Sequence, residues 1–278
     1  MRDKIKIVCI GDLVGLPGRA LFKKHSIRLK EQYRADAIIV NGENSASDGR
    51  GITPLIADFF KKYGAQIITS GNHIFAKRDI YGYLASHKDI LRPANFPATC
   101  PGTGVTLFSV ADIKIGVINV QGRVFMRELV SCPFKAAESA ILFLKSHTQV
   151  IIVDMHAEAS SEKLGLAYYL DGQASVVYGT HTHVQTADER LLPQGTAFIT
   201  DLGMGGSINS MIGMKRQPIL HNLLTQMPVK FEVELEGPYQ MLGIIVTIDV
   251  KSGKTLVIER FKVVDEHLDL TDPELRDK

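Results

Sequence analysis

The sequence is poor in cysteine and has no tryptophan among its 278 residues. Its three cysteines, Cys9, Cys100 and Cys132, are odd in number and never fall at CxxC spacing. This pattern indicates neither a disulfide framework nor a thiolate zinc site, because the first is built from several cysteine pairs and the second from closely spaced cysteines. A reducing cytoplasm is the predicted location.

Long hydrophobic runs and a strong net charge are also absent. No stretch stays apolar for the roughly 20 residues that a membrane-spanning helix needs, and no signal-peptide core follows Met1. The formal net charge is only +2, and no long run of Lys and Arg is present. We therefore expect no membrane insertion and no binding of duplex nucleic acid, whereas small anionic substrates remain compatible.

The composition is that of an ordinary globular protein, with 45% hydrophobic and 22% charged residues. A chain of this length can bury a large core. No internal repeat, low-complexity segment or linker rich in Pro, Gly or Ser marks a boundary. The sequence therefore predicts a single domain over residues 1–278.

Apolar, β-branched runs alternate with amphipathic segments along the chain, and this alternation predicts an α/β fold. The predicted strands cover residues 5–10, 37–40, 66–69, 149–153, 175–178 and 196–200, and the predicted hairpins pair 105–110 with 113–120 and 241–250 with 255–264. The predicted helices cover residues 19–33, 53–64, 78–86, 134–146 and 215–226, with another that follows 160–162 and ends at 170. A turn is expected at 15–18 and a solvated tail at the C-terminus. The hairpins make the predicted sheet mixed.

Polar side chains follow five of the predicted strands. In open α/β sheets the functional crevice lies beyond the carboxyl ends of the strands, so these side chains converge if the strands lie side by side. The residues concerned are Asp12, Glu43, Asn44, Asn72, His73, His156, His181 and His183. Carboxylate and amide oxygens together with imidazole nitrogens, and no thiolate, suit manganese, iron or zinc.

These eight groups are too many for one tetrahedral ion. They fit two ions that a carboxylate bridges, roughly 3.5–4 Å apart. Such a pair serves the hydrolysis of phosphate esters, in which a shared hydroxide attacks phosphorus in line while both ions neutralise charge on the phosphoryl oxygens.

The segment 178–183, Tyr-Gly-Thr-His-Thr-His, follows a buried strand. If this segment is extended, His181 and His183 point to the same side, because side chains alternate along a strand. Paired imidazoles suit a metal, since each offers one nitrogen and keeps the other for an orienting hydrogen bond. For this segment alone, a surface turn is the alternative interpretation.

Taken together, these motifs resemble a known superfamily. Asp12 after the first strand, Asn72-His73 within GNH, the isolated His156 and the GTHTH segment stand in the order found in the calcineurin-like metallophosphoesterases. The resemblance covers about residues 5–205. It implies an α/β/β/α sandwich of two mixed sheets flanked by helices.

Two departures from the superfamily pattern narrow the resemblance. The usual DxH is Asp12-Leu13-Val14 here, without the histidine, and the usual GD is replaced by NGEN at 41–44. In both departures the chain resembles one bacterial branch of the superfamily, the YmdB-like phosphodiesterases. In that branch the glutamate bridges the metals, and the adjacent asparagine replaces the missing histidine. NGEN is therefore the most discriminating motif in the chain.

The resemblance also implies roles for single residues. It places Asp12, Glu43, Asn44 and His183 on one metal and Glu43, Asn72, His156 and His181 on the other, with Glu43 as the bridge. Two ions per chain are expected, with iron or manganese ahead of zinc. His73 would be the general acid that protonates the departing ester oxygen. Many relatives follow this histidine with an acidic residue, whereas Ile74 follows it here, so the group that orients His73 is left open.

The activity implied by the resemblance is that of a phosphodiesterase acting on cyclic nucleotides, 2',3'-cyclic, 3',5'-cyclic or both. One alternative is a phosphomonoesterase or nucleotidase on the same site. A second alternative is a metal-containing regulatory protein that acts through a partner. Association into a homo-oligomer is compatible with each of these functions.

Taken one at a time, the site residues have plainer interpretations. Asp12 and Asn72 could cap helices, His156 could be a core histidine, and Glu43 could be a solvated loop residue. Independent caps and loops would rarely also reproduce NGEN, GNH and THTH in order, and this recurrence favours the metal site.

Three further residues keep two interpretations each. Arg123 and Arg127 could clamp a phosphate or be ordinary surface residues. Asp201 could line the crevice or belong to a tight turn.

Overall fold

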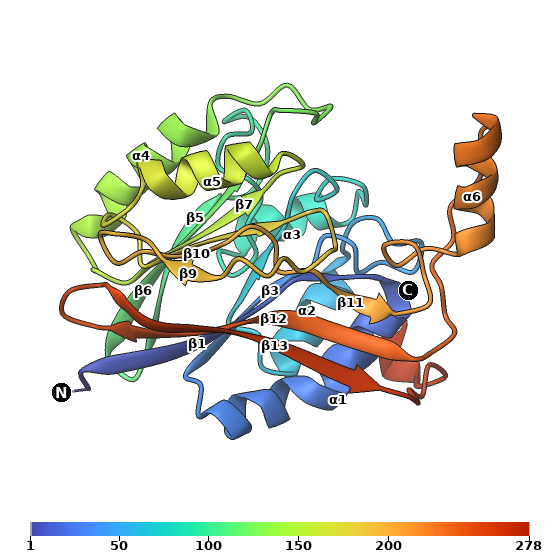
Figure 1. Ribbon diagram of the computed structural model, residues 1–278, viewed down its shortest axis with the longest axis horizontal. Helices are drawn as coiled ribbons and strands as arrows, with labels where there is room; N and C mark the ends of the chain where they lie inside the picture. The colour runs from blue at the N-terminus through green and yellow to red at the C-terminus, as the bar shows by residue number, and fades with distance from the viewer. Residues whose placement is uncertain (1, 278) are drawn as a thin grey trace.

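Two mixed β-sheets pack face to face in the computed structural model, which describes residues 2–277 (Figure 1). The seven strands of the first sheet are β1 (Lys4–Ile10), β2 (Asp12–Leu13), β3 (Ala37–Asn41), β4 (Ile67–Thr69), β11 (Met204–Ser207), β12 (Tyr239–Asp249) and β13 (Thr255–Asp265). Their order is β2-β11-β12-β1-β3-β4, and β13 pairs with β12. Strand β1 runs parallel to β3 and antiparallel to β12.

The second sheet has six strands in the order β5-β6-β7-β8-β10-β9. They are β5 (Val105–Val110), β6 (Ile113–Gln121), β7 (Ile151–His156), β8 (Val176–Thr180), β9 (Arg190–Leu191) and β10 (Ala197–Ile199). Strands β6, β7 and β8 are parallel, whereas β5 and β6 form an antiparallel hairpin.

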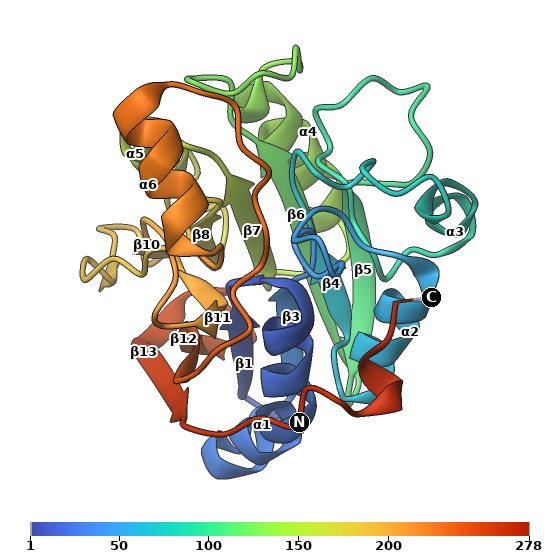
Figure 2. The same cartoon turned by 90° about the vertical axis from the view of Figure 1, so that its right-hand side faces the viewer.

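Helices cover the outer faces of both sheets, whereas α6 projects from the sandwich (Figures 1 and 2). In chain order the helices are α1 (Gly15–Tyr33), α2 (Pro54–Lys62), α3 (Ile80–Ser86), α4 (Pro133–Lys145), α5 (Ser160–Tyr169), α6 (Arg216–Thr225) and the 3-10 helix η1 (Pro273–Leu275). Helices α1 and α2 pack on the first sheet, while α4 and α5 pack on the second. None of the helices within residues 2–277 combines the length and hydropathy needed to cross a bilayer.

Three buried apolar clusters separate these four layers. Side chains such as Ile7, Ile39 and Ile152 meet between the two sheets. Each sheet is therefore covered on both faces, and this explains why its central strands read as nearly continuous runs of Val and Ile. The α/β/β/α sandwich predicted from the sequence is confirmed, as are its mixed sheets and both predicted hairpins.

One local prediction was wrong at the start of the chain, and two short strands were not predicted. The expected turn at 15–18 is the first turn of α1, which begins at Gly15. Pro17 is tolerated there because the first turn of a helix leaves its N–H groups without intrahelical partners. No sequence pattern indicated β2 and β11, which are two and four residues long. Their pairing joins Asp12 to Met204, so it depends on contacts far apart in the sequence.

The C-terminal tail is exposed along most of its described length, as predicted, but it is anchored at one buried residue, which was not predicted. Leu275 is 1% exposed and packs into the layer of α1 and α2. Lys23 of α1 contacts the carboxylates of Asp272 and Glu274 at 2.5 and 2.6 Å. An apolar anchor and complementary charges hold the tail against the helices, and Figure 2 shows the C-terminus beside α2.

Candidate metal centre

All eight predicted site residues lie where strands of the two sheets end. Glu43 and Asn44 follow β3, Asn72 and His73 follow β4, and Asp12 begins β2. In the second sheet, His156 is the last residue of β7, and His181 and His183 follow β8. The two sheets meet closely at this edge: a Cβ atom at Gly71 would lie 2.0 Å from the ring of His156, so the GNH motif needs its glycine there.

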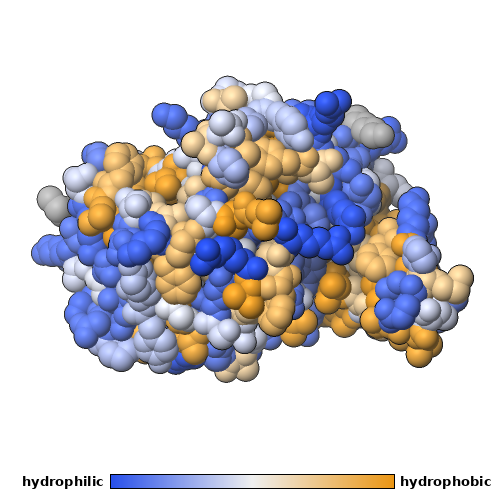
Figure 3. All heavy atoms as spheres, turned by 90° about the horizontal axis from the view of Figure 1, so that it is seen from above, coloured by the Kyte–Doolittle hydropathy of each residue, from blue (hydrophilic) through white to orange (hydrophobic). Residues whose placement is uncertain are grey.

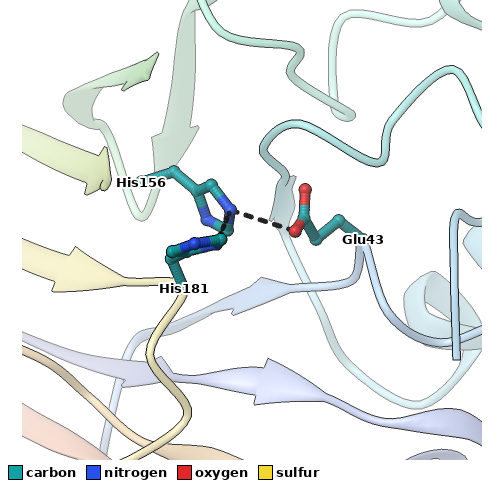
Figure 4. A group of neighbouring side chains, drawn as sticks. All are labelled: Glu43, His156 and His181. Carbon is teal, nitrogen blue, oxygen red and sulfur yellow. Dashed lines mark hydrogen bonds and ion pairs between the residues drawn. The ribbon is translucent and has the colours of Figure 1, made fainter. Parts of the chain in front are cut away.

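Glu43, His156 and His181 form the first of two groups at this edge, and their ligating atoms lie within 4.8 Å of one another (Figure 4). Nε2 of His156 is 3.0 Å from Oε1 of Glu43 and 3.1 Å from Nδ1 of His181. Oδ1 of Asn72 is also 3.1 Å from the same Nε2 atom. Four electron-pair donors therefore converge on one point, where a cation would satisfy all of them.

The tautomer of His156 follows from its other hydrogen bonds. The hydroxyl of Thr180 donates to Oδ1 of Asp154 at 2.7 Å. The same hydroxyl is 2.9 Å from Nδ1 of His156, and since its one proton is already used, it accepts a hydrogen bond from Nδ1–H. Nε2 of the neutral ring consequently carries the lone pair that faces Glu43, which is the arrangement of a metal-binding histidine.

The electrostatics of this group also favour bound positive charge. Burial by itself lowers the pKa of His156, but the adjacent Glu43 carboxylate outweighs burial and raises the pKa to about 9. Burial first, and the neighbouring His156 second, lower the pKa of His181 to about 3. The group thus accepts a single positive charge next to Glu43 and disfavours protonation of the second imidazole.

The second group contains Asp12, Asn44 and His183. Nε2 of His183 lies 3.7 Å from Oδ1 of Asp12. Nδ1 of His183 donates to the backbone oxygen of Ile212 at 2.8 Å, which leaves the lone pair on Nε2.

Two buried oxygens in the second group have no hydrogen-bond partner within residues 2–277. They are Oδ1 of Asp12 and Oδ1 of Asn44. The amide nitrogen of Asn44 donates to the oxygen of Gly49 at 3.1 Å, which identifies Oδ1 as the free atom. Leaving a buried acceptor unpaired costs about 1–3 kcal/mol, so both oxygens fit a cation ligand role. Oxygen and imidazole donors without thiolate suit manganese, iron or zinc.

The prediction that His181 and His183 share one face of an extended strand was wrong. Strand β8 ends at Thr180, and the two histidines have φ angles of 101° and 66°. On this left-handed backbone their rings reach different groups: His181 faces Glu43 and His156, whereas His183 faces Asp12.

Asp201 holds this unusual loop in place. One of its carboxylate oxygens accepts the backbone N–H of Thr182 at 3.1 Å and the ammonium of Lys163 at 2.7 Å. Asp201 and Lys163 are both fully buried. Of the two interpretations of Asp201, a supporting position beside the site is therefore the one that its contacts favour.

Replacing Lys163 with methionine should destabilise the protein and disturb the histidine loop. The change leaves the Asp201 carboxylate buried without its counter-charge, and breaking one side of a buried ion pair costs about 3–5 kcal/mol. Urea unfolding should show a lower free energy of unfolding, and metal analysis should show weaker metal retention. Lys135→Met, which removes an exposed lysine beside Glu138, is the matched control and should change neither quantity noticeably. Equal unfolding free energies for the two variants would contradict the role given to Lys163.

His73 stands at the edge of the first group. Its Nδ1 lies 3.3 Å from the amide nitrogen of Asn44 and 3.5 Å from Oε1 of Glu43, and its backbone N–H donates to Oε2 of Glu43 at 3.1 Å. These contacts supply the orientation that the sequence left open, since Nδ1 is held by Asn44 and Glu43. Nε2 is the ring atom that remains for a ligand.

A cavity of about 330 Å³ opens over both groups. Its lining contains five of the predicted residues, Glu43, Asn44, His73, His181 and His183. Arg123 and Arg127 are exposed and do not line it, which favours their interpretation as surface residues.

The cavity also has lining residues that no sequence motif indicated. They are Gly49, Arg50, Glu158, Ile212, Met214, Ile219 and Phe231. Of these, Glu158 lies 3.2 Å from Nε2 of His181 and follows His156 by two positions, which is the only cue that the sequence offered.

For three of the site residues the plainer interpretation does not fit the geometry. Asp12 lies in β2, and the N-cap of α1 is Val14, so Asp12 does not cap that helix. Asn72 lies well before α3, whose N-cap is Asp79. Glu43 is fully buried rather than solvated.

Comparison with known proteins gives consistent matches over nearly the whole chain. The model of a protein family described as YmdB-like protein matches residues 8–261. A 2',3'-cyclic-nucleotide 2'-phosphodiesterase of Bacillus subtilis (strain 168) is 43% identical over 264 residues, which cover 95% of this chain and 99% of that protein.

Two solved structures are similar in both fold and sequence. A phosphatase from Mycoplasma pneumoniae superposes with a TM-score of 0.89 at 33% identity, covering 99% of this chain and 97% of that one. A hypothetical protein from Thermus thermophilus superposes with a TM-score of 0.85 at 32% identity, covering 94% of this chain and 100% of that one.

Proposed function

The chain belongs to the YmdB-like protein family, and from this membership we propose that it is a metal-dependent phosphoric diester hydrolase acting on nucleoside 2',3'-cyclic phosphates. The observation that carries the proposal is the convergence of Glu43, His156 and His181 beside a cavity of about 330 Å³, which Glu43 and His181 line. The activity named for the Bacillus subtilis relative, at 43% identity over nearly the whole length, supports the substrate class.

We propose two metal ions per chain, with iron or manganese ahead of zinc. Asp12, Glu43, Asn44 and His183 are the proposed ligands of one ion, and Glu43, Asn72, His156 and His181 are those of the other. The two unpartnered oxygens of the second group and the converging donors of the first support this division. When bound, such a pair would activate a water and neutralise charge on the phosphoryl oxygens.

The residues of the chain have distinct tasks in this proposal. Asp12 and Glu43 supply the negative charge that holds cations at a buried position. Thr180 fixes the ring of His156, and Asp201 fixes the loop that carries His181. Nε2 of His73 would deliver a proton to the departing ester oxygen, since its other ring nitrogen is held by Asn44.

The proposed site takes ligands from both sheets, so we propose that the whole chain works as one metallophosphoesterase domain. The three cysteines are free, in accord with the proposed reducing cytoplasmic location. Small phosphate esters are the proposed substrates.

A substrate panel tests the proposed function. The protein, reconstituted with manganese or iron, should hydrolyse adenosine 2',3'-cyclic phosphate with a higher kcat/KM than adenosine 3'-monophosphate, and adenosine 3',5'-cyclic phosphate completes the panel. Faster turnover of the monoester would instead support the phosphomonoesterase alternative. The similar structure from Mycoplasma pneumoniae is described as a phosphatase, which is why this alternative is tested. Failure to hydrolyse any phosphate ester would overturn the proposal.

A further inference from the structure

The cavity over the metal centre has two chemically different walls. One wall carries the carboxylate, amide and imidazole groups described above. The other consists of Ile212, Met214, Ile219 and Phe231. A ligand that fills this space must have a polar group that binds at the carboxylate, amide and imidazole wall and an apolar part that contacts the other wall.

The apolar wall belongs to the capping segment, residues 208–238, which connects β11 to β12. Its base is a two-stranded stem in which Met214 pairs with Val233, and Lys215 N–H donates to the oxygen of Glu232 at 2.8 Å. The stem carries α6, which stands away from the sandwich in Figure 1 and has no buried residue. The capping segment therefore adds little to the core.

The stem is nevertheless fixed relative to the metal centre. The backbone oxygen of Ile212 accepts the hydrogen bond from Nδ1 of His183, so a proposed metal ligand and the wall share one contact. Val233 is buried and packs with Val14, Met204 and Met214.

Gly49 makes a close approach between the stem and the body possible. Its φ is 77°, and a Cβ atom there would lie 2.4 Å from the methyl carbon of Met214. The wall is therefore held over the site by the packing of Met214 and Val233 at the base of the stem.

The wall exposes large apolar side chains where they can meet a ligand. Phe231 is 39% exposed and Ile212 is 51% exposed. Single exposed apolar residues are ordinary, but several that share one cavity with polar groups are typical of a small-molecule site. Figure 3 shows hydrophobic side chains gathered at the right-hand end of the molecule, where α6 projects in Figure 1. The cavity volume of about 330 Å³ suits a single nucleotide, because small-molecule sites begin at about 300 Å³.

We infer that this wall is the nucleobase subsite, with Phe231 and Ile219 in contact with the base while the cyclic phosphate lies against Glu43 and His73. This inference rests on the proposed function. The base is the part of a cyclic nucleotide with broad apolar faces, and aromatic side chains bind such faces by stacking without regard to base identity. The wall therefore contributes to the binding of the nucleoside and takes no part in the reaction at the phosphate.

Two variants of the wall test the inference with a matched pair of substrates. Phe231→Ala and Ile219→Ala should raise the KM for adenosine 2',3'-cyclic phosphate about 10-fold, with kcat nearly unchanged. Neither should change the KM for 1-O-methylribose 2',3'-cyclic phosphate, which lacks a base. Leu224→Ala is the control, since Leu224 lies on α6, is 83% exposed and does not line the cavity. It should behave as the unchanged protein with both substrates.

A binding measurement separates this inference from the proposed function. Calorimetry on the manganese-loaded protein should show adenosine 3'-monophosphate binding about 10-fold more tightly than ribose 3-phosphate, and Phe231→Ala should remove that difference. If the unchanged protein hydrolyses neither cyclic phosphate, the proposed function fails, and the calorimetric difference still decides the role of the wall. Equal losses with and without a base, or no loss in either wall variant, would overturn the nucleobase subsite.

Discussion

Glu43→Ala is expected to abolish turnover of adenosine 2',3'-cyclic phosphate and to deplete both metal ions. Oε1 of Glu43 lies 3.0 Å from Nε2 of His156 in the first group, and Glu43 directly precedes Asn44 of the second group in the chain. Loss of the Glu43 carboxylate should therefore affect both proposed metal sites. Replacing groups that merely support a metal ligand costs roughly 10- to 100-fold in affinity or activity, and losing a bridging ligand should exceed this range. Metal analysis of the purified variant, together with its kcat, measures the two effects.

Two comparisons sharpen this prediction. Glu138→Ala removes a partly exposed carboxylate on α4 that lies outside the candidate site, and it should retain the normal metal content and activity. His181→Ala and His183→Ala should each deplete one ion preferentially, because the two rings face different groups. Undiminished activity in Glu43→Ala, or equal loss of both ions in each histidine variant, would contradict the bridged arrangement.

His73→Ala is expected to lower kcat for the cyclic nucleotide by about 10²- to 10⁴-fold while the metal content stays normal. The size of this effect is that of losing a general acid, and the proposed metal ligands are all retained. His73 is only partly buried, so the protein should still fold. Steady-state kinetics with parallel metal analysis provide the measurement.

A change of leaving group separates proton donation from a structural role of His73. Bis(p-nitrophenyl) phosphate releases a stable phenolate that needs little protonation, so His73→Ala should impair its hydrolysis far less than that of the cyclic nucleotide. Nε2 of His73 is the atom available for this task, because Nδ1 faces Asn44 and Glu43. Equal losses with the two substrates would show that His73 acts on the site geometry instead.

The layers of the fold were predictable from local pattern. Runs such as 37–40 and 150–153 are apolar at every position, which is typical of strands that are buried on both faces of a sheet. The start of α1 and the pairing of β2 with β11 were not predictable in this way, because they depend on first-turn geometry at Pro17 and on a contact between Asp12 and Met204. The docked tail was missed for the same reason, since its charges find partners on α1.

The chemistry of the candidate site was determined by the sequence itself. The donor atoms are properties of the residues, and NGEN, GNH and THTH carry carboxylate, amide and imidazole donors in the order of the strands. Their position at strand ends followed from the alternation of strands and helices, because parallel strands place their carboxyl ends at one edge.

The resemblance implied that His181 and His183 serve different ions, but only the tertiary structure shows the backbone conformation that separates their rings. Alternation along a strand would put His181 and His183 on one face, but the buried pair of Lys163 and Asp201 holds their loop in a left-handed conformation that sends the rings to separate groups. The apolar wall had no signal in the sequence either. Phe231 lines the cavity over the candidate site because the stem packs on Gly49 and the backbone oxygen of Ile212 accepts a hydrogen bond from His183. These contacts exist only once the chain has folded.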